Sequence, residues 1–418
     1  MSAGEQERDS FVHWLNPFDP AFRDNPYPTY HRLRERDPIH LLPEFNLWCL
    51  TRYTDVQAVL RDPRFSSEPT SDDPNLFRNL RESGGELGPL AQTMLHWMPL
   101  KDPPHHTRLR HLVNKAFTPR HIEAMRPRIG AIVEQLLEPV VEAGRMDLVR
   151  DLAHPLPVIV IAEMLGVPVA DQGELKQWSD DMALALDPLQ VGAHREEGDR
   201  AVRAMTKLFE RVVQARRRAP RDDLLSALLA AEEQGDRLSM DELLATCVLL
   251  LFAGNETTTN LLGNGVLALL KNPHELALLQ QDPSLVRGAV EELLRYDSPL
   301  QFAARVAKQD IEIDGRTLRA GQRAMLILGS ANHDPAQFPD PDRLDVRRSD
   351  HRHLAFGFGT HFCLGAGLAR AEAQIALDTL VRRLPGLRLG AEPPVRRPSI
   401  ALRGLSSLPV EFEGRRSH

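Results

Sequence analysis

The chain has few cysteines, no long hydrophobic run and no excess of basic residues. Its 418 residues include three cysteines, Cys49, Cys247 and Cys363, too few for a disulfide framework and too widely spaced for a metal knuckle. The longest apolar run, residues 243–254, is broken by Thr246 and falls far short of the ~20 residues of a membrane span. The net charge of −7 and the lack of a polybasic block argue against a nucleic-acid partner.

Signals for targeting and for internal repeats are also absent. Residues 1–36 are rich in charge and proline and lack the apolar core of a signal peptide, so we expect a cytoplasmic protein with no membrane attachment. No period of about 20–50 residues repeats, which argues against a solenoid. The hydrophobic fraction of 42% and the charged fraction of 26% are those of a folded globular chain.

Helical patterns dominate the sequence. Thr118-Pro119 supplies an N-cap followed by proline at the first helical position, which predicts a helix to about Val141. The capping box Ser239–Glu242 predicts a helix through Lys271, a rod of roughly 45 Å. Shorter helices are expected over two further segments, Pro155–Leu165 and Asp222–Glu233.

Strand signals are short and lie in two regions of the chain. Ile39–Leu42 and Leu47–Leu50 flank a turn, and Ile311–Ile313 leads into the hairpin signal Asp314-Gly315. Gln322–Leu328 is a further strand candidate. Because the strands are interleaved with helices from both halves, we expect one compact domain that is mainly α with small β-sheets.

The segment Phe356–Gly365 places a cysteine inside a glycine-rich loop. Its glycines allow positive φ and close approach to a flat ligand, and they stand at Gly357, Gly359 and Gly365. A helical pattern opens directly after Cys363, and a helix start favours a thiolate through its dipole and free N–H groups. The loop is therefore a candidate site for a thiolate-bound group.

Two other interpretations of this loop remain open at the level of the residues. Cys363 could be a buried structural cysteine, as most unpaired cysteines are. It could also ligate zinc with His351, His353 and His361, although that spacing fits no usual zinc motif.

A second candidate site interrupts the apolar centre of the long predicted helix. Ala253–Thr258 brings a carboxylate and hydroxyls into a stretch that is otherwise hydrophobic. Such groups lose hydration and compete with the helical hydrogen bonds. Their placement indicates a chemical task, a kink or a satisfied buried network.

The cysteine segment reads Phe-Gly-x-Gly-x-His-x-Cys-x-Gly, and it resembles the haem-ligand signature of the cytochrome P450 superfamily, in particular its soluble bacterial-type haem-thiolate monooxygenases. The resemblance implies a cytochrome P450 domain over residues 10–416 after a disordered N-terminus, residues 1–9. It implies one long central helix over a haem b. Cys363 would ligate the iron, His361 would contact a propionate, Phe356 would cover the thiolate face and Gly365 would admit the cofactor.

The resemblance extends to distant positions in the expected order. Glu292 and Arg295, three residues apart, match the Glu-x-x-Arg pair of the family's structural triad. Arg343 would be the second arginine of that triad. His106 and Arg110, four residues apart on one helix face, would hold the haem propionates together with Arg305.

The polar centre of the long helix also matches the family. By resemblance, Glu256 and Thr257 are its acid–threonine pair over the haem, which delivers protons to oxygen. The distal pocket would be lined by mostly apolar side chains that suit a small lipophilic substrate. The residues expected to contact substrate are Met94, Trp97, Leu249, Ala253, Phe302 and Ile400.

The implied activity is insertion of one oxygen atom from O₂ into a secondary metabolite such as a polyketide, macrolide or terpenoid, by hydroxylation or epoxidation. No Gly-x-Gly-x-x-Gly phosphate loop follows a strand, so electrons would come from a ferredoxin or flavodoxin with its NAD(P)H reductase. Basic residues could receive that acidic carrier, among them Arg108, His111, Lys115, Arg347 and Arg352. The protein is expected to be a monomer.

Two alternative functions would each lack part of this set of residues. A peroxide-driven fatty-acid peroxygenase would lack the acid–threonine pair. A non-catalytic haem-binding sensor or recruitment homologue would lose either that pair or the ligand cysteine. Glu256, Thr257 and Cys363 are all present here, which favours the monooxygenase.

Overall fold

The longest helix begins at the capping box that the sequence predicts. The Ser239 hydroxyl accepts a hydrogen bond from the Glu242 N–H at 3.1 Å, and the Glu242 carboxylate accepts one from the Ser239 N–H at 2.9 Å. This exchange satisfies two N–H groups that a helix start otherwise leaves unpaired. The resulting helix, α12, spans Met240–Lys271 and extends for about 48 Å.

The structure is a computed structural model that describes residues 19–69, 87–187, 193–231 and 235–414. The chain forms two compact units, each made of non-consecutive segments. The first comprises Met1–Ser66, Gly263–Cys363 and Ala391–Leu408, and the second comprises Ser67–Leu262, Leu364–Gly390 and Pro409–His418. Neither unit is therefore a continuous stretch of sequence. Residues 1–9, expected to be disordered, lie outside the described residues.

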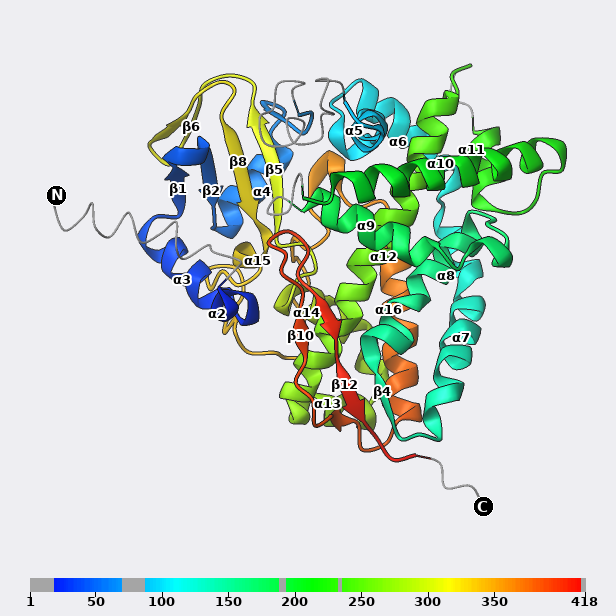
Figure 1. Cartoon of the computed structure of the whole chain (residues 1–418). Coiled ribbons are helices and arrows are strands. Elements are labelled where there is room, and N and C mark those ends of the chain that lie inside the picture. The colour runs from blue at the N-terminus through cyan, green and yellow to red at the C-terminus, as the bar shows by residue number, and fades with distance from the viewer. Residues whose placement is uncertain (1–18, 70–86, 188–192, 232–234, 415–418) are drawn as a thin grey trace. The chain divides into compact units, whose positions relative to one another are not determined.

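The first unit combines short helices with most of the β-structure (Figure 1). Its helices are α2 (Pro20–Asp24), α3 (Tyr27–Arg36), η1 (Pro43–Phe45), α4 (Tyr53–Arg61), α13 (Pro273–Gln281), η6 (Pro283–Leu285), α14 (Val286–Tyr296), α15 (Leu328–Ala331) and η7 (Gly359–His361). Its strands are β1 (Ile39–Leu42), β2 (Leu47–Leu50), β3 (Phe65–Ser66), β5 (Phe302–Ala307), β6 (Ile311–Ile313), β7 (Arg316–Leu318), β8 (Arg323–Ile327), β10 (Val395–Arg396) and β11 (Leu405–Ser407).

A five-stranded sheet in the order β1-β2-β8-β5-β3 forms the frame of this unit. β2 and β8 pair in parallel, and the other neighbours are antiparallel. The hydrophobic cluster on this sheet includes Leu50, Leu326 and Leu354, and Phe358 packs against it. The sheet therefore supports the segment that carries the cysteine loop.

Buried charge joins distant segments of the same unit. The Asp297 carboxylate lies 2.6 Å from Arg403 Nε and 3.2 Å from Arg396 Nη2, and it accepts a 2.8 Å hydrogen bond from the Tyr27 hydroxyl. Burial alone would raise the pKa of Asp297, but Arg403 and Arg396 outweigh that effect and lower it to about 2. The ionised carboxylate thus holds the start of α3 and the 391–408 segment to the end of α14.

The second unit is largely helical (Figure 1). Besides the first part of α12, its helices are α5 (Pro89–Met94), η3 (Met98–Leu100), α6 (His105–Ala116), α7 (Pro119–Val141), η4 (Val149–Ala153), α8 (Pro155–Met164), η5 (Val169–Asp171), α9 (Leu175–Leu186), α10 (Arg195–Arg218), α11 (Leu224–Ala230) and α16 (Ala366–Arg383). β4 (Arg145–Asp147), β12 (Pro409–Glu411) and β9 (Arg388–Leu389) form a small sheet in that order.

Close helix packing in this unit depends on one glycine. A Cβ added at Gly198 of α10 would lie 2.5 Å from the Ala185 Cβ of α9, a distance that the two helices could not keep. Gly198 therefore sets how closely α10 approaches α9. Among the described helices, none is both long and apolar enough to cross a membrane.

Glu372 on α16 is a buried carboxyl whose ionisation affects the stability of the fold. Its side chain is 1% exposed, its Oε2 has no hydrogen-bond partner among the described residues, and burial raises its pKa well above the usual value. The folded protein holds this carboxyl neutral, whereas the unfolded chain ionises it, so its contribution to stability is lost as pH rises above about 4.5.

We expect Glu372→Gln to stabilise the holoprotein by roughly 1–3 kcal/mol at about pH 8 and by little at about pH 5. Denaturant unfolding at the two pH values measures the difference. Glu138→Gln is the matched control, because Glu138 is 78% exposed. An equal effect of Glu372→Gln at both pH values would show that ionisation of this carboxyl is not the cause.

Candidate functional site

The cysteine loop has the backbone conformation that its glycines suggest. Gly357 and Gly359 adopt φ values of 69° and 74°, a region that side chains other than glycine rarely enter. The Cys363 N–H donates a 2.9 Å hydrogen bond to the Phe356 carbonyl and closes the loop. α16 begins three residues further on, with Gly365 as its N-cap.

Gly365 departs from the predicted conformation. Its φ is −80°, and a Cβ built there would meet nothing within 4 Å. The expectation of positive φ at this glycine is therefore wrong, because the helix start needs only ordinary backbone angles. At Gly359, by contrast, a Cβ would lie 3.0 Å from the Leu60 carbonyl. The close approach to α4 requires glycine there.

Only one of the three cysteines is suited to act as a ligand. Cys49 and Cys247 are fully buried, and burial raises the pKa of each thiol to about 12. A thiol with such a pKa is a poor source of the thiolate that binds metals. Cys363 is partly exposed at the end of its loop. The donor chemistry and the glycine-shaped loop thus fit a thiolate-bound cofactor.

The zinc interpretation finds no support in the geometry. His353 Nε2 lies 3.1 Å from a Glu291 carboxylate oxygen. In the described part of the chain, neither group of three or more side chains with metal-ligand spacing includes Cys363, His351, His353 or His361. These side chains therefore do not form a common metal site.

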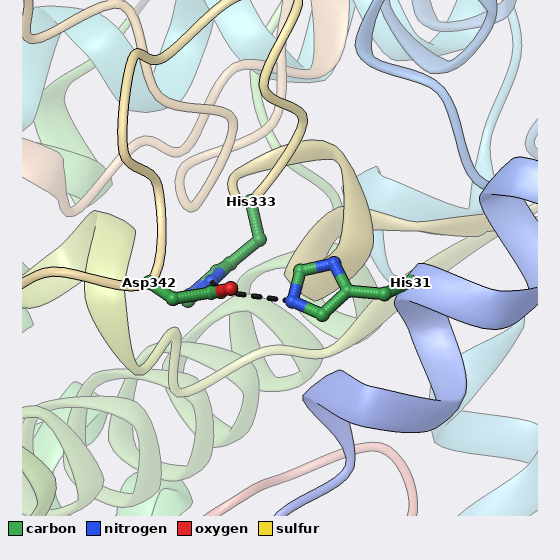
Figure 2. A group of neighbouring side chains, drawn as sticks. All are labelled: His31, His333 and Asp342. Carbon is green, nitrogen blue, oxygen red and sulfur yellow. Dashed lines mark hydrogen bonds and ion pairs between the residues drawn. The ribbon is translucent and has the colours of Figure 1, made fainter.

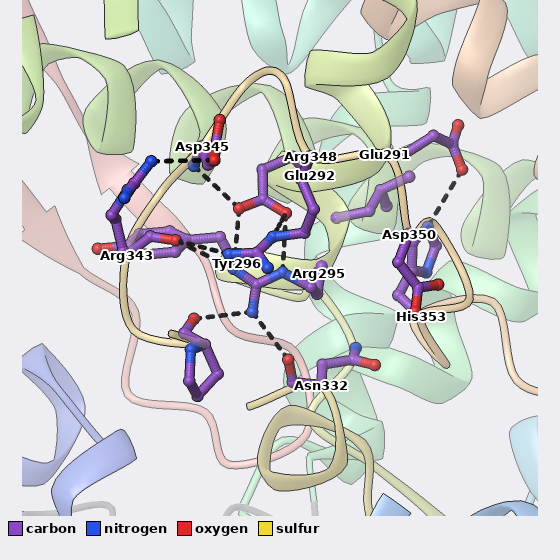
Figure 3. A network of polar contacts seen from close by, with 12 residues as sticks. Glu291, Glu292, Arg295, Tyr296, Asn332, Arg343, Asp345, Arg348, Asp350 and His353 are labelled. Atoms are coloured by element: carbon purple, nitrogen blue, oxygen red, sulfur yellow. Dashed lines mark hydrogen bonds and ion pairs between the residues drawn. The ribbon is translucent and has the colours of Figure 1, made fainter. Parts of the chain in front are cut away.

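The predicted Glu292–Arg295 pair is a buried, two-pronged ion pair on α14. Arg295 Nε and Nη2 donate to the two Glu292 oxygens at 2.7 and 2.8 Å, and both side chains are 1% exposed. Arg295 Nη1 also donates to the carbonyls of Asn332 and Pro341. Figure 3 shows these contacts linking α14 to the loop that precedes the cysteine segment.

Arg343 does not take the predicted place of the second arginine. Its side chain is 66% exposed and pairs with Asp345, and only its backbone carbonyl accepts from Arg295. The second guanidinium belongs to Arg348, whose Nε lies 3.1 Å from a Glu292 oxygen (Figure 3). The motif fixes no side-chain direction in an irregular loop, and both arginines lie within reach of α14.

His31, His333 and Asp342 form a second compact polar group in the first unit, beside a cavity of about 400 Å³. Asp342 lies between the two imidazoles, with its Oδ1 2.8 Å from each (Figure 2). Arg34 Nη2 lies 2.6 Å from His31 Nδ1 and can only donate a hydrogen bond. His31 Nδ1 therefore accepts, and the proton of the neutral imidazole is on Nε2. In this tautomer His31 Nε2 has no lone pair to offer a metal.

The polar interruption of α12 remains inside a continuous helix. The Thr257 hydroxyl donates to the Ala253 carbonyl at 2.9 Å, and Glu256 is 1% exposed. Leu249, Ala253 and Thr257 form a partly exposed stripe on an otherwise mostly buried helix. Their spacing of four residues places them on one face. Three predicted site residues thus share the open face of α12.

The remaining predicted cofactor contacts lie in both units. His106 is buried and Arg110 half-buried one turn later on α6, in the second unit. Arg305 lies on β5 in the first unit, where its Nη1 donates to the Ala304 carbonyl at 2.8 Å. Phe356 and His361 lie in the cysteine loop, and the Phe356 ring meets Phe362 edge to face at 6.2 Å.

The predicted substrate contacts are mainly apolar and differ in burial. In the second unit, Met94 and Trp97 are buried, and Trp97 stacks on Phe252 of α12 with 6.2 Å between ring centroids. In the first unit, Phe302 and Ile400 are half-buried. Two proposed docking cations are already engaged within the chain: Arg108 pairs with Asp236 and Glu242, and Arg352 with Asp350.

This mainly helical fold, with its glycine-shaped cysteine loop, is that of a haem-thiolate monooxygenase. The family model described as Cytochrome P450 matches residues 96–385. The chain is 41% identical to the cytochrome P450 monooxygenase PikC of Streptomyces venezuelae over 400 residues, covering 94% of this chain and 92% of the relative. It is 40% identical to the 6-deoxyerythronolide B hydroxylase of Saccharopolyspora erythraea, covering 94% and 98%.

Solved structures agree with these relatives. The crystal structure of P450BioI in complex with an acyl carrier protein ligated to hexadec-9Z-enoic acid matches with a TM-score of 0.87 and 39% identity. The match covers 94% of this chain and 99% of that chain. The chain therefore belongs to the cytochrome P450 family, as a monooxygenase of the bacterial type, and its cofactor is haem b.

The network around Glu292 generates a matched pair of mutational predictions. Arg348→Ala removes a guanidinium from a carboxylate that is 1% exposed and should cost about 1–3 kcal/mol of unfolding free energy. Arg343→Ala should cost less than about 0.5 kcal/mol, because that side chain is largely solvated. Denaturant unfolding of both variants measures this; a larger loss for Arg343→Ala would reinstate the motif-based assignment.

Proposed function

We propose that this cytochrome P450 oxidises a small lipophilic secondary metabolite, by hydroxylation or epoxidation, with Cys363 as the iron ligand. The main support for this proposal is the conformation of the cysteine loop. The Cys363 N–H closes the loop by its hydrogen bond to the Phe356 carbonyl, and Cys363 is partly exposed. Relatives include a 6-deoxyerythronolide B hydroxylase and the polyketide biosynthesis cytochrome P450 PksS of Bacillus subtilis. These names favour a polyketide or macrolide substrate.

The bound haem supplies the oxygen chemistry, and the residues of this chain hold and protect it. Cys363 would bind the iron as thiolate, and Gly357 and Gly359 supply the positive φ angles that shape the loop around it. By the family resemblance, His106, Arg110, Arg305 and His361 would neutralise the haem propionates through charge-assisted hydrogen bonds. Phe356 shields the sulfur from water, which keeps the thiolate available as a ligand.

Two residues at the centre of α12, Thr257 and Glu256, serve proton delivery in this proposal. The Thr257 hydroxyl donates its own proton to the Ala253 carbonyl, so its lone pairs accept a hydrogen bond on the open face of the helix. The buried Glu256 carboxyl is one residue away and serves as the acid of this pair. By the family resemblance, the apolar side chains that would exclude water and contact substrate are Met94, Trp97, Leu249, Ala253, Phe302 and Ile400.

Electrons come from a separate carrier in this proposal. The sequence holds no phosphate loop for a nicotinamide cofactor, so a ferredoxin or flavodoxin with an NAD(P)H reductase fills that role. Arg347 and His111 are exposed basic candidates for its docking, whereas Arg108 and Arg352 are paired with acids of the chain.

Replacing the cysteines one at a time tests the ligand assignment. The reduced wild-type protein with carbon monoxide should show the red-shifted absorption band of thiolate ligation. Cys363→Ser should abolish this band because it removes the sulfur donor. Cys49→Ser and Cys247→Ser should keep it, since those thiols are buried and held protonated near neutral pH. Loss of the band in either control, at full haem content, would contradict the assignment.

The acid–threonine pair separates the monooxygenase from its alternatives. Thr257→Ala should keep haem, substrate binding and reductant consumption but release hydrogen peroxide in place of product. Glu256→Gln should slow oxygen turnover about 10²-fold, because it removes the proton source. Product and peroxide per reductant are the quantities to measure. Full coupling in Thr257→Ala would move proton delivery elsewhere, and wild-type turnover with peroxide alone would favour a peroxygenase.

A further inference from the structure

Three helical segments of the second unit bring one imidazole and two carboxylates together. His154 lies at the start of α8, Asp180 on α9 and Glu256 on α12, and one polar atom of each lies within 4.8 Å of the others. His154 Nε2 is 3.5 Å from Asp180 Oδ1. This cluster joins Glu256, the acid of the proposed pair, to two residues that sequence reasoning missed.

The solvent exposure of the cluster increases from Glu256 and His154 to Asp180. Glu256 and His154 are each 1% exposed, whereas the Asp180 side chain is 27% exposed. An imidazole thus lies beside both a buried carboxyl and a carboxylate that reaches solvent. Imidazole is the side chain best suited to accept a proton on one nitrogen and release one from the other.

His154 directly follows an irregular turn of the chain. A single π-helical turn, η4 (Val149–Ala153), precedes it, and the His154 N–H donates to the Val149 carbonyl at 2.9 Å. Such turns are rare and occur frequently at functional sites. Neither ring nitrogen of His154 has a hydrogen-bond partner among the described residues. A buried polar ring in that state costs free energy, which a structural role would not require.

A neighbouring hydrogen bond sets the register of the cluster. Asn255 Nδ2 donates to the Ser179 hydroxyl at 3.0 Å, and these residues directly precede Glu256 and Asp180 in the chain. The same Asn255 side chain accepts from the Thr259 hydroxyl at 3.2 Å. α9 and α12 are therefore fixed at the point where the two carboxylates approach His154.

We propose that His154 and Asp180 form the proton supply of Glu256. The Glu256 carboxyl gives up one proton in the monooxygenase reaction and becomes a carboxylate. The His154 imidazolium then protonates this carboxylate. The imidazole regains a proton from solvent through Asp180. Each cycle moves one proton inwards, transfers no electrons and leaves the three side chains in their starting state. His154 and Asp180 act as positioning residues in this relay, which rests on the proposed function of Glu256.

The two outer members of the cluster, His154 and Asp180, can be replaced without removing Glu256. His154→Gln keeps a polar side chain but cannot carry a proton, and Asp180→Asn removes the outer carboxylate. Asp181→Asn is the matched control, because Asp181 is the next residue on α9 and contacts Gln177 instead. Asp180→Asn also guards against a folding defect of His154→Gln, since Asp180 is partly solvated.

With haem content and substrate-binding spectra unchanged, His154→Gln should lower reductant-driven product formation roughly tenfold or more. The loss should come with an increased solvent isotope effect on reductant consumption. Asp180→Asn should act in the same direction and more weakly. The double variant should be no worse than His154→Gln alone, because a serial relay is interrupted only once. Asp181→Asn should match wild type in both readouts.

A readout independent of turnover is the ¹⁵N spectrum of the His154 ring, assigned by its loss in His154→Gln. The two ring nitrogen shifts report where the proton resides and should change in Asp180→Asn and Glu256→Gln but not in Asp181→Asn. Unchanged shifts in both variants, or additive kinetic losses in the double variant, would overturn the relay. So would one tightly bound zinc ion per wild-type chain that His154→Gln loses, because a metal would occupy the ring lone pair.

Failure of the relay and failure of the proposed function give different results. If wild type shows no O₂-dependent product with an electron carrier, the monooxygenase proposal fails. If wild type turns over normally and His154→Gln keeps its rate and isotope effect, only the relay fails.

Discussion

The buried ion pair between Glu292 and Arg295 is the interaction on which the cysteine loop depends. Two charges at 1% exposure are favourable only where every remaining donor and acceptor is used, and here they are. Arg295 bonds the Asn332 carbonyl, and the Asn332 side chain accepts from the Leu354 N–H at 2.7 Å. The Leu354 carbonyl accepts from Gly357. A continuous series of hydrogen bonds thus runs from the ion pair to the loop that Cys363 closes.

The sequence predicted helices and strands accurately where their ends are set by a few adjacent residues. The helix starts at Thr118 and at Ser239, and the strands at Ile39–Leu42 and Leu47–Leu50, agree with the structure. Caps and short alternating strands depend on a few adjacent residues, so their positions can be deduced without the fold. The helix expected over Asp222–Glu233 is shorter, Leu224–Ala230, although Asp223 caps it as its type suggests.

The sequence was less informative where an irregular loop or a tertiary contact determines which way a side chain points. The motif placed an arginine at Arg343, but the loop turns that side chain to solvent and directs Arg348 to Glu292. The pairing of His154 with Asp180 could not be foreseen either, because 26 positions separate them and no spacing rule links the start of α8 to α9. Chemistry that joins several elements becomes visible only after those elements have packed.

The arrangement of α12 shows how one helix can be both core and site. Most of its circumference is buried, which stabilises the fold, while the stripe Leu249, Ala253 and Thr257 stays partly open. The polar groups of the next face, Asn255 and Glu256, are buried. Asn255 bonds Ser179 of α9, and Glu256 meets His154. The residues proposed for apolar contact and those proposed for proton delivery are therefore separated by less than a turn of the same helix. In the proposed function, this separation would let the open face of α12 exclude water while Glu256 draws protons from solvent through His154 and Asp180.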